Sequence, residues 1–205
     1  ANFITTKTIM FFKKIILFLT IMSIANVHSI DLQSKTIQNS KIETAILAGG
    51  CFWGIENLFS KLDGVINTEV GYTGGDVENP NYQLVSTGIT GHAESVKILF
   101  DPNKISYQRI LKYFFSIHDP TQLNQQQNDI GSQYASIIFY QNEKQKLIAN
   151  DIIKEAQDKK IYNSSIKTKI VPAKKFYPAE NYHQKYLEKN PQGYNCHYQR
   201  RQWIF

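Results

Sequence analysis

The stretch AILAGGCFWGIENLF, residues 45–59, contains the point at which an apolar strand is expected to give way to a helix. Thr44–Leu47 is predicted as a short buried strand, and the Gly-Gly pair that follows it as a loop. From Trp53 onward the apolar residues have helical spacing. Cys51 is therefore expected at a helix N-terminus, where free N–H groups and the helix dipole favour an anion and lower a thiol pKa. A small buried thiol or half of a structural disulfide is the alternative.

The N-terminal thirty residues differ from the rest of the chain. They comprise a basic start at residues 10–14 (MFFKK), an apolar run at residues 15–25 and small residues at 27–29. This order is typical of a secretory signal, so we expect a signal peptide over residues 1–29, with Met10 as the true start. The protein would then be exported, either to a periplasm or as a secreted protein. The apolar run is short for a membrane span, and an uncleaved membrane anchor is the alternative.

Length and composition favour one globular domain. The chain has 205 residues, of which 42% are hydrophobic, enough for one well-buried core.

The formal net charge is +6, and signal cleavage would remove three lysines and no acid. No stripe of basic and aromatic residues is present, so a nucleic-acid partner is not expected. The Arg200-Arg201 pair is expected on a solvated tail, residues 198–205.

The two cysteines, Cys51 and Cys196, have a purely structural reading. An exported protein lies where disulfides persist, and a bridge closing so long a loop would stabilise the fold by about 5 kcal/mol in the chain-entropy model. The cysteines therefore leave two functional classes open. One is a non-catalytic binding domain held together by a Cys51–Cys196 disulfide. The other is a general thiol-disulfide oxidoreductase, but the sequence has no C-x-x-C.

Strands and helices are expected to alternate after a polar linker over residues 30–42. The patterns predict strands at 64–72, 94–100, 135–140 and 168–171, helices at 106–117, 143–158 and 180–189, and a long polar loop at 118–134. This alternation with mixed loop lengths predicts an α+β fold, a two-layer sandwich with one mixed sheet.

Polar residues with chemical potential collect in the loops and at strand ends. Glu94 opens an apolar strand, and a carboxyl desolvated beside aromatics has a raised pKa, which suits a general acid. Tyr82 and Tyr134 end polar loops, and Asp129 lies within one. Each also has a structural reading as an edge carboxylate, a packing tyrosine or a loop cap. Three histidines, which we expect to be structural, complete the set: His92, His118 and His183. No metal-site spacing is present.

Six segments together resemble one family, the A-type methionine sulfoxide reductases, or peptide-methionine (S)-S-oxide reductases. The resemblance runs in order over residues 43–197, the expected catalytic domain. The segments are GCFWGIE (50–56), VGYTGGDVENPNY (70–82), TGHAESVKILFDP (90–102), FFSIHDPTQLNQQQNDIGSQY (114–134), FYPAENYHQKYL (176–187) and KNPQGYNCH (189–197).

The resemblance assigns a role to each candidate in the first half of the reaction. It implies that Cys51 is the nucleophile that attacks the sulfoxide sulfur and becomes a sulfenic acid. Glu94 matches the acid that protonates the departing oxygen. Tyr82 and Tyr134 match the hydroxyls that hydrogen-bond that oxygen, and Asp129 matches a supporting polar residue. Phe52 and Trp53 match the apolar pocket for the substrate methyl group. The run containing Tyr182, His183 and Tyr186 is expected to form a wall of the site.

The resemblance also implies how the enzyme is recycled. Cys196 matches the cysteine that attacks the sulfenic acid and forms a Cys51–Cys196 disulfide, which an external dithiol such as thioredoxin reduces. The implied fold is ferredoxin-like. No metal or organic cofactor is expected, the substrates are oxidised proteins or free methionine sulfoxide, and the protein is expected to be a monomer. Ser132, Ala135 and the Arg200-Arg201 tail depart from the family pattern.

Overall fold

A computed structural model describes residues 42–204 of the chain. The expected signal peptide lies outside the described residues, as does all but the last residue of the expected linker. In chain order the elements are β1 (Glu43–Gly49), α2 (Phe52–Phe59), β2 (Val65–Thr73), α3 (Tyr82–Val85), β3 (Ala93–Phe100), α4 (Tyr107–Ile117), β4 (Gln125–Gln126), β5 (Asp129–Ile130), η1 (Ser132–Tyr134), β6 (Ser136–Tyr140), α5 (Glu143–Asp158), β7 (Lys169–Pro172), β8 (Tyr177–Pro178), α6 (Tyr186–Lys189) and η2 (Arg201–Trp203).

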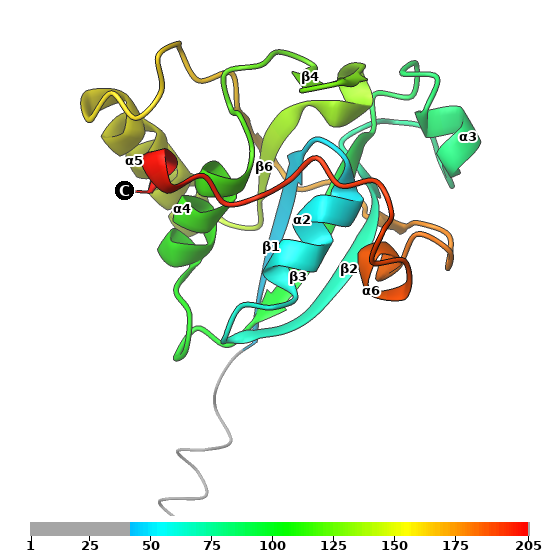
Figure 1. The fold of residues 1–205 in the computed structure, drawn as a ribbon, viewed down its shortest axis with the longest axis horizontal. Helices are drawn as coiled ribbons and strands as arrows, with labels where there is room; N and C mark the ends of the chain where they lie inside the picture. The colour runs from blue at the N-terminus through cyan, green and yellow to red at the C-terminus, as the bar shows by residue number, and fades with distance from the viewer. Residues whose placement is uncertain (1–41, 205) are drawn as a thin grey trace, which may run out of the picture. The chain divides into compact units, whose positions relative to one another are not determined.

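Six of the strands form one sheet, in the order β7-β6-β1-β3-β2-β8 (Figure 1). Every neighbouring pair is antiparallel except β6 and β7, which run parallel. Helix α2 connects β1 to β2, and α4 connects β3 to β6. The expected α+β class with a mixed sheet is confirmed.

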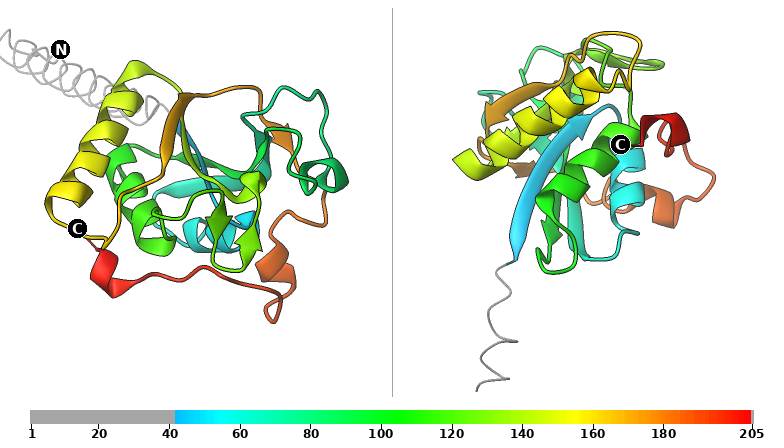
Figure 2. Two further views of the ribbon diagram at one scale, coloured as in Figure 1. Left: turned by 90° about the horizontal axis from the view of Figure 1, so that it is seen from above. Right: turned by 90° about the vertical axis from the view of Figure 1, so that its left-hand side faces the viewer.

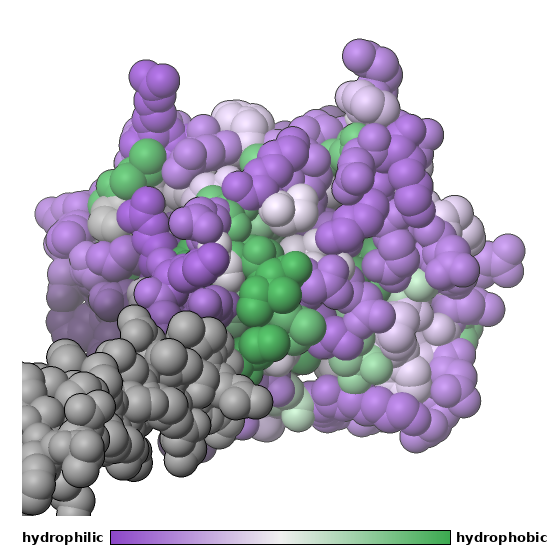
Figure 3. Space-filling model, turned by 90° about the horizontal axis from the view of Figure 1, so that it is seen from below, coloured by the Kyte–Doolittle hydropathy of each residue, from purple (hydrophilic) through white to green (hydrophobic). Residues whose placement is uncertain are grey.

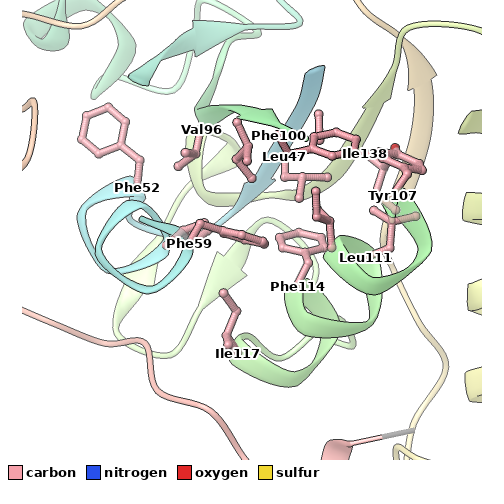
Figure 4. Close-up of a cluster of buried hydrophobic side chains, with 14 of the residues drawn as sticks. Leu47, Phe52, Phe59, Val96, Phe100, Tyr107, Leu111, Phe114, Ile117 and Ile138 are labelled. Carbon is pink, nitrogen blue, oxygen red and sulfur yellow. The ribbon is translucent and has the colours of Figure 1, made fainter. Parts of the chain in front are cut away.

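The main core lies between one face of the sheet and the helices α2, α4 and α5. Leu47 pairs with Val96 across β1 and β3 and with Ile138 across β1 and β6, so the three side chains share this face. Phe114 of α4 and Phe59 of α2 pack in the same buried cluster (Figure 4). Helices α4 and α5 lie side by side over one end of the sheet (Figure 2). The opposite face carries a smaller buried cluster that includes Ile46 and Phe139.

Side-chain caps fix where the two longest helices within residues 42–204 begin. Ser106 accepts a hydrogen bond from the N–H of Arg109 at the start of α4, and Asn142 accepts one from Gln145 at the start of α5. Both starts agree closely with the sequence prediction. Helix α2 has no such cap, because its N-cap residue is Cys51.

The helix predicted over residues 180–189 is wrong for its first part, since only α6 is helical. Lys185 has a φ of 53°, and its N–H donates to Oε2 of the buried Glu56 at 2.8 Å. The side-chain amide of Gln184 exchanges hydrogen bonds with both backbone groups of Val70 in β2. These bonds to α2 and β2 hold residues 184–185 outside a helix.

The loop predicted over residues 118–134 has more order than its composition indicates. It contains a small hairpin of β4 and β5, followed by the 3-10 turn η1. Gln127, in the connection between the two strands, has a φ of 56°. The hairpin carries Asp129 to the turn between β1 and α2.

The surface seen in Figure 3 is mostly hydrophilic, with one compact hydrophobic area near its centre. Within residues 42–204, no helix has the length and apolarity needed to cross a membrane.

Candidate active site

Cys51 occupies the sharp turn between β1 and α2. Gly50 makes this turn with a φ of +104°, and a Cβ there would lie 2.6 Å from the side chain of Gln126. Glycine alone fits both the conformation and the space. The turn leaves Cys51 at the N-cap of α2, buried with 7% of its surface exposed. The expected position of this cysteine is confirmed.

Glu94 supplies the cap that α2 lacks in its own sequence. Its Oε2 accepts a hydrogen bond from the N–H of Phe52 at 3.1 Å, from the neighbouring strand β3. Burial raises the pKa of Glu94 to about 8, and the charge of Asp129 adds to this effect. At neutral pH the carboxyl group is therefore mostly protonated, as a general acid requires.

The expected lowering of the Cys51 pKa is wrong. Burial and the nearby Glu94 raise the pKa of the thiol well above its usual value. The backbone N–H of Trp53 acts in the opposite direction, as predicted for a helix N-terminus, but does not outweigh burial. The sequence indicated the helix terminus but not how deeply the turn is buried beneath the C-terminal segment.

The two candidate tyrosines reach the same site from separate elements. Tyr82 begins α3, with its N–H donating to Glu180 at 2.9 Å, and Tyr134 ends η1. Burial raises the pKa of both, and the charges of Glu94 and Cys51 contribute. Both hydroxyls thus stay protonated at neutral pH and can donate hydrogen bonds close to the Cys51–Glu94 pair.

An aromatic wall lies beside the nucleophile. The Trp53 indole stacks on Tyr186 with ring centroids 3.8 Å apart, and its Nε1 donates to Nδ1 of His183 at 3.0 Å. Phe52 is fully buried against Tyr72 and His183, with centroid distances of 5.9 and 5.1 Å. His183 and Tyr186 lie against these aromatic rings, where a wall of the site was expected, while Tyr182 is mostly exposed.

The C-terminal segment brings the second thiol to the site. It crosses the turn between β1 and α2 and ends beside α4 (Figure 1). Both cysteines are free thiols, and the charge of Cys196 acts on Cys51. The Cys196 Sγ lies 3.3 Å from Oδ2 of Asp129, and this oxygen also accepts from the Tyr194 hydroxyl at 3.1 Å.

The expected solvated tail is wrong for Arg200. The N–H of Arg200 donates to the carbonyl of Ser116 at 2.9 Å, and its guanidinium donates to the carbonyl of Ile117 at 3.0 Å. The side chain is buried, with its charge over the rings of Tyr198 and Trp203. It ties the C-terminal segment to the last turn of α4, where carbonyl groups lack helical partners.

The structure brings all eight candidate residues to one place and adds two that the sequence analysis missed. Glu180 accepts hydrogen bonds from the Tyr72 hydroxyl and the Tyr82 N–H. His197 contacts the Cys196 thiol. The sequence GYNCH places Cys196 and His197 next to each other, which was the available signal for this contact. Neighbouring side chains in an extended segment usually point apart, so the sequence did not predict it.

Two of the remaining histidines have structural roles, as expected. His92 holds the loop after β2 through Gly75 and Val77. His118 is fully buried between the Phe114 carbonyl and the Ser136 hydroxyl. Among the described residues, no group of three or more His, Cys, Asp or Glu side chains could hold a metal ion.

Comparison with known proteins identifies the family of the chain. The sequence model of the family "Peptide methionine sulfoxide reductase" matches residues 43–204. The peptide methionine sulfoxide reductase MsrA of Methanothermobacter thermautotrophicus is 50% identical over 152 residues, which are 74% of this chain and 90% of that protein.

Solved structures give the same result. The reduced form of Mxr1 from Saccharomyces cerevisiae superposes with a TM-score of 0.75 at 38% identity, covering 80% of this chain and 94% of that one. Mxr1 in complex with Trx2 has a TM-score of 0.54 at 26% identity, covering 80% and 93%. The chain belongs to the peptide methionine sulfoxide reductase family, which is a family of oxidoreductases.

Proposed function

We propose that this protein reduces methionine S-sulfoxide, free or within oxidised proteins, to methionine. The observation that carries the proposal is the pairing of Cys51 with Glu94 at the start of α2. A buried thiol beside a protonated buried carboxyl group combines a nucleophile with an acid. Reduction of a sulfoxide needs both, because its oxygen must leave with a proton as its sulfur is attacked.

The first step transfers the oxygen from the substrate to Cys51. The sulfur of Cys51 attacks the sulfoxide sulfur while Glu94 protonates the oxygen, which gives an adduct with a new S–S bond. The hydroxyl group then moves to the Cys51 sulfur as this S–S bond and the substrate S–O bond break, and the thiol proton replaces the proton that Glu94 has given up. The products are methionine and a Cys51 sulfenic acid. This exchange keeps the buried site neutral overall, which suits a thiol and a carboxyl group whose pKa values are both raised.

The surrounding side chains are proposed to make this step specific for one epimer of the sulfoxide. The hydroxyls of Tyr82 and Tyr134 are proposed to hold the oxygen, and Phe52 with Trp53 to hold the methyl group. A fixed methyl pocket and a fixed oxygen site present the sulfur atom of only one epimer to Cys51 in the orientation needed for attack.

Recycling is proposed to use Cys196 and an external dithiol. Cys196 attacks the sulfenic acid, water leaves, and a Cys51–Cys196 disulfide forms. The complex that the related yeast protein Mxr1 forms with Trx2 supports a thioredoxin-like reductant. Since the dithiol supplies both electrons, the cycle balances without a metal or organic cofactor. Asp129 is proposed as a supporting residue through its contact with the Cys196 thiol.

Finer features of the molecule are part of the same proposal. We propose a catalytic domain over residues 43–197 that acts as a monomer, exported through a cleaved signal at residues 1–29. The basic start, apolar run and small residues support export. A two-layer ferredoxin-like arrangement is supported by the order β6-β1-β3-β2, with α2 and α4 as the connecting helices.

An assay with the two separate epimers of methionine sulfoxide tests the activity. With a reduced dithiol as donor, we expect the S epimer to be turned over and the R epimer to react far more slowly. The measurement is methionine release over time by chromatography. Equal rates for both epimers, or no release from the S epimer, would rule out the proposed activity.

Replacing Glu94 with glutamine tests the acid. Glutamine keeps an oxygen for the Phe52 N–H but has no proton to give, so sulfoxide reduction is expected to slow by about 10²- to 10⁴-fold. In the parent, ionisation of Glu94 should lower the rate as the pH rises through about 8, and this fall should vanish in the variant.

The exposed Glu188 provides the matched control. Glu188→Gln makes the same chemical change at a surface position and should keep the parental rate and pH profile. A loss below threefold in Glu94→Gln would show that the proton comes from another group.

A further inference from the structure

His197 joins the second thiol to the turn that carries the first. Its Nε2 lies 2.9 Å from the carbonyl oxygen of Gly49, and its Nδ1 lies 3.1 Å from the Sγ of Cys196. The residue is 2% exposed and packs against Gly54, where a Cβ would come within 2.6 Å of Nδ1. The imidazole is thus held in one place by α2 and β1.

These contacts define which ring nitrogen carries the proton. The Gly49 carbonyl can only accept a hydrogen bond, so Nε2 must be the donor. Burial lowers the pKa of His197 to about 4, and the charge of Arg200 also lowers it, while the Gly49 contact acts in the opposite direction, so the ring is neutral. Nδ1 therefore has a free lone pair, which lies 3.1 Å from the Cys196 thiol and can take up its proton.

The Cys196 thiol needs such an acceptor. Burial and the carboxylate of Asp129 raise its pKa to about 12, so the group is a protonated, weak nucleophile at neutral pH. Asp129 is the other group within reach, and its Oδ2 can accept a hydrogen bond from the thiol at 3.3 Å, but the charge of Asp129 opposes formation of a thiolate. His197 is neutral and accepts the proton without that repulsion.

We propose that His197 is a catalytic base for disulfide formation, with Nδ1 taking the Cys196 proton as the sulfur attacks. The inference rests on the function proposed above and concerns its second half. The S–S bond forms as the S–O bond of the Cys51 sulfenic acid breaks. The hydroxyl group leaves as water after taking up the proton that His197 has received. The Cys51 sulfur is reduced, and the Cys196 sulfur is oxidised.

Two substitutions separate proton uptake from anchoring. His197→Gln keeps an N–H near Nε2 for the Gly49 carbonyl, and His197→Asn keeps an oxygen near Nδ1 for the thiol. Neither amide has a basic lone pair that could relay the thiol proton during the attack, as an imidazole nitrogen has. A role as an anchor predicts parental behaviour for the first variant, and a role as a simple acceptor predicts it for the second. A base predicts that both variants are impaired in disulfide formation while the first step is unaffected.

The test is a single turnover of fully reduced protein with methionine S-sulfoxide and no added reductant. Methionine release reports the first step, and loss of free thiols reports disulfide formation. Both variants are expected to release one equivalent of methionine at a rate within about twofold of the parent. Loss of thiols should slow by about 10²-fold or more, the usual worth of a positioned base. The Cys51 sulfenic acid should then accumulate and react with dimedone.

The exposed Tyr198 provides a control within the same segment, and Tyr198→Phe should match the parent in both steps. Parental loss of thiols in either His197 variant would overturn the inference. Equal slowing of methionine release and thiol loss would also overturn it, because that result indicates a structural role. Failure of the parent itself to release methionine would instead reject the proposed function.

Discussion

Replacing Cys51 with serine is expected to abolish reduction of methionine S-sulfoxide, leaving no methionine release above the uncatalysed background. A serine hydroxyl at this position is buried and protonated and is far too weak a nucleophile at neutral pH. The substitution changes one atom and leaves the Glu94 contact with the Phe52 N–H in place, so the fold should persist. The measurement is methionine release with a reduced dithiol as donor.

Cys196 provides an internal control in the Cys51→Ser variant. In folded Cys51→Ser protein, Cys196 should remain as a single countable thiol after treatment with substrate, because nothing oxidises it. Substantial turnover by the serine variant would mean that Cys51 is not the nucleophile. Consumption of the Cys196 thiol by substrate would point to that cysteine as the attacking group.

Cys196→Ser should have the next largest effect, and only on repeated turnover. The reduced variant is expected to release one equivalent of methionine per chain and then stop when the donor is a dithiol such as reduced thioredoxin. Cys51 would remain a sulfenic acid, since no internal thiol is left to form the disulfide that the donor reduces. Single-turnover methionine release combined with thiol counting measures both parts.

This variant also separates a recycling thiol from a structural staple. A staple predicts that loss of Cys196 lowers the stability of the oxidised native protein by several kcal/mol and affects activity only through folding. The structure has both cysteines as free thiols within a complete core. A folded variant with full repeated turnover would exclude the recycling role, whereas an unfolded variant would favour the staple.

Local patterns predicted most of the secondary structure. Helix α5 has the predicted bounds, and α4 and β2 differ from prediction by about one residue, because apolar periodicity and capping side chains act within a few positions. The helix predicted over residues 180–185 was wrong because distant contacts decide the conformation there. Their backbone and side chains bond to Glu56 and Val70, which lie far away in sequence, and such bonds override local propensity.

The clustering of the candidate residues was predicted better than their electrostatics. The raised pKa of Glu94 followed from a carboxyl group among aromatics, and the structure agrees. The pKa of Cys51 moved the other way from prediction, because the burial that raises it depends on how the whole chain packs around the turn. The contact of His197 with both Gly49 and Cys196 likewise depends on the path of the C-terminal segment.

That path has a consequence for the order in which the protein matures. The contact between His197 and Gly49 joins residues 148 positions apart, and such contacts form late because a long loop must close first. During synthesis the strands and helices that hold Cys51 and Glu94 emerge well before the segment that carries Cys196. We therefore expect Cys51 to be in place in a nascent chain before Cys196, the thiol proposed to convert its sulfenic acid into a disulfide. An oxidant that reaches the chain in this interval would leave a sulfenic acid without its internal partner.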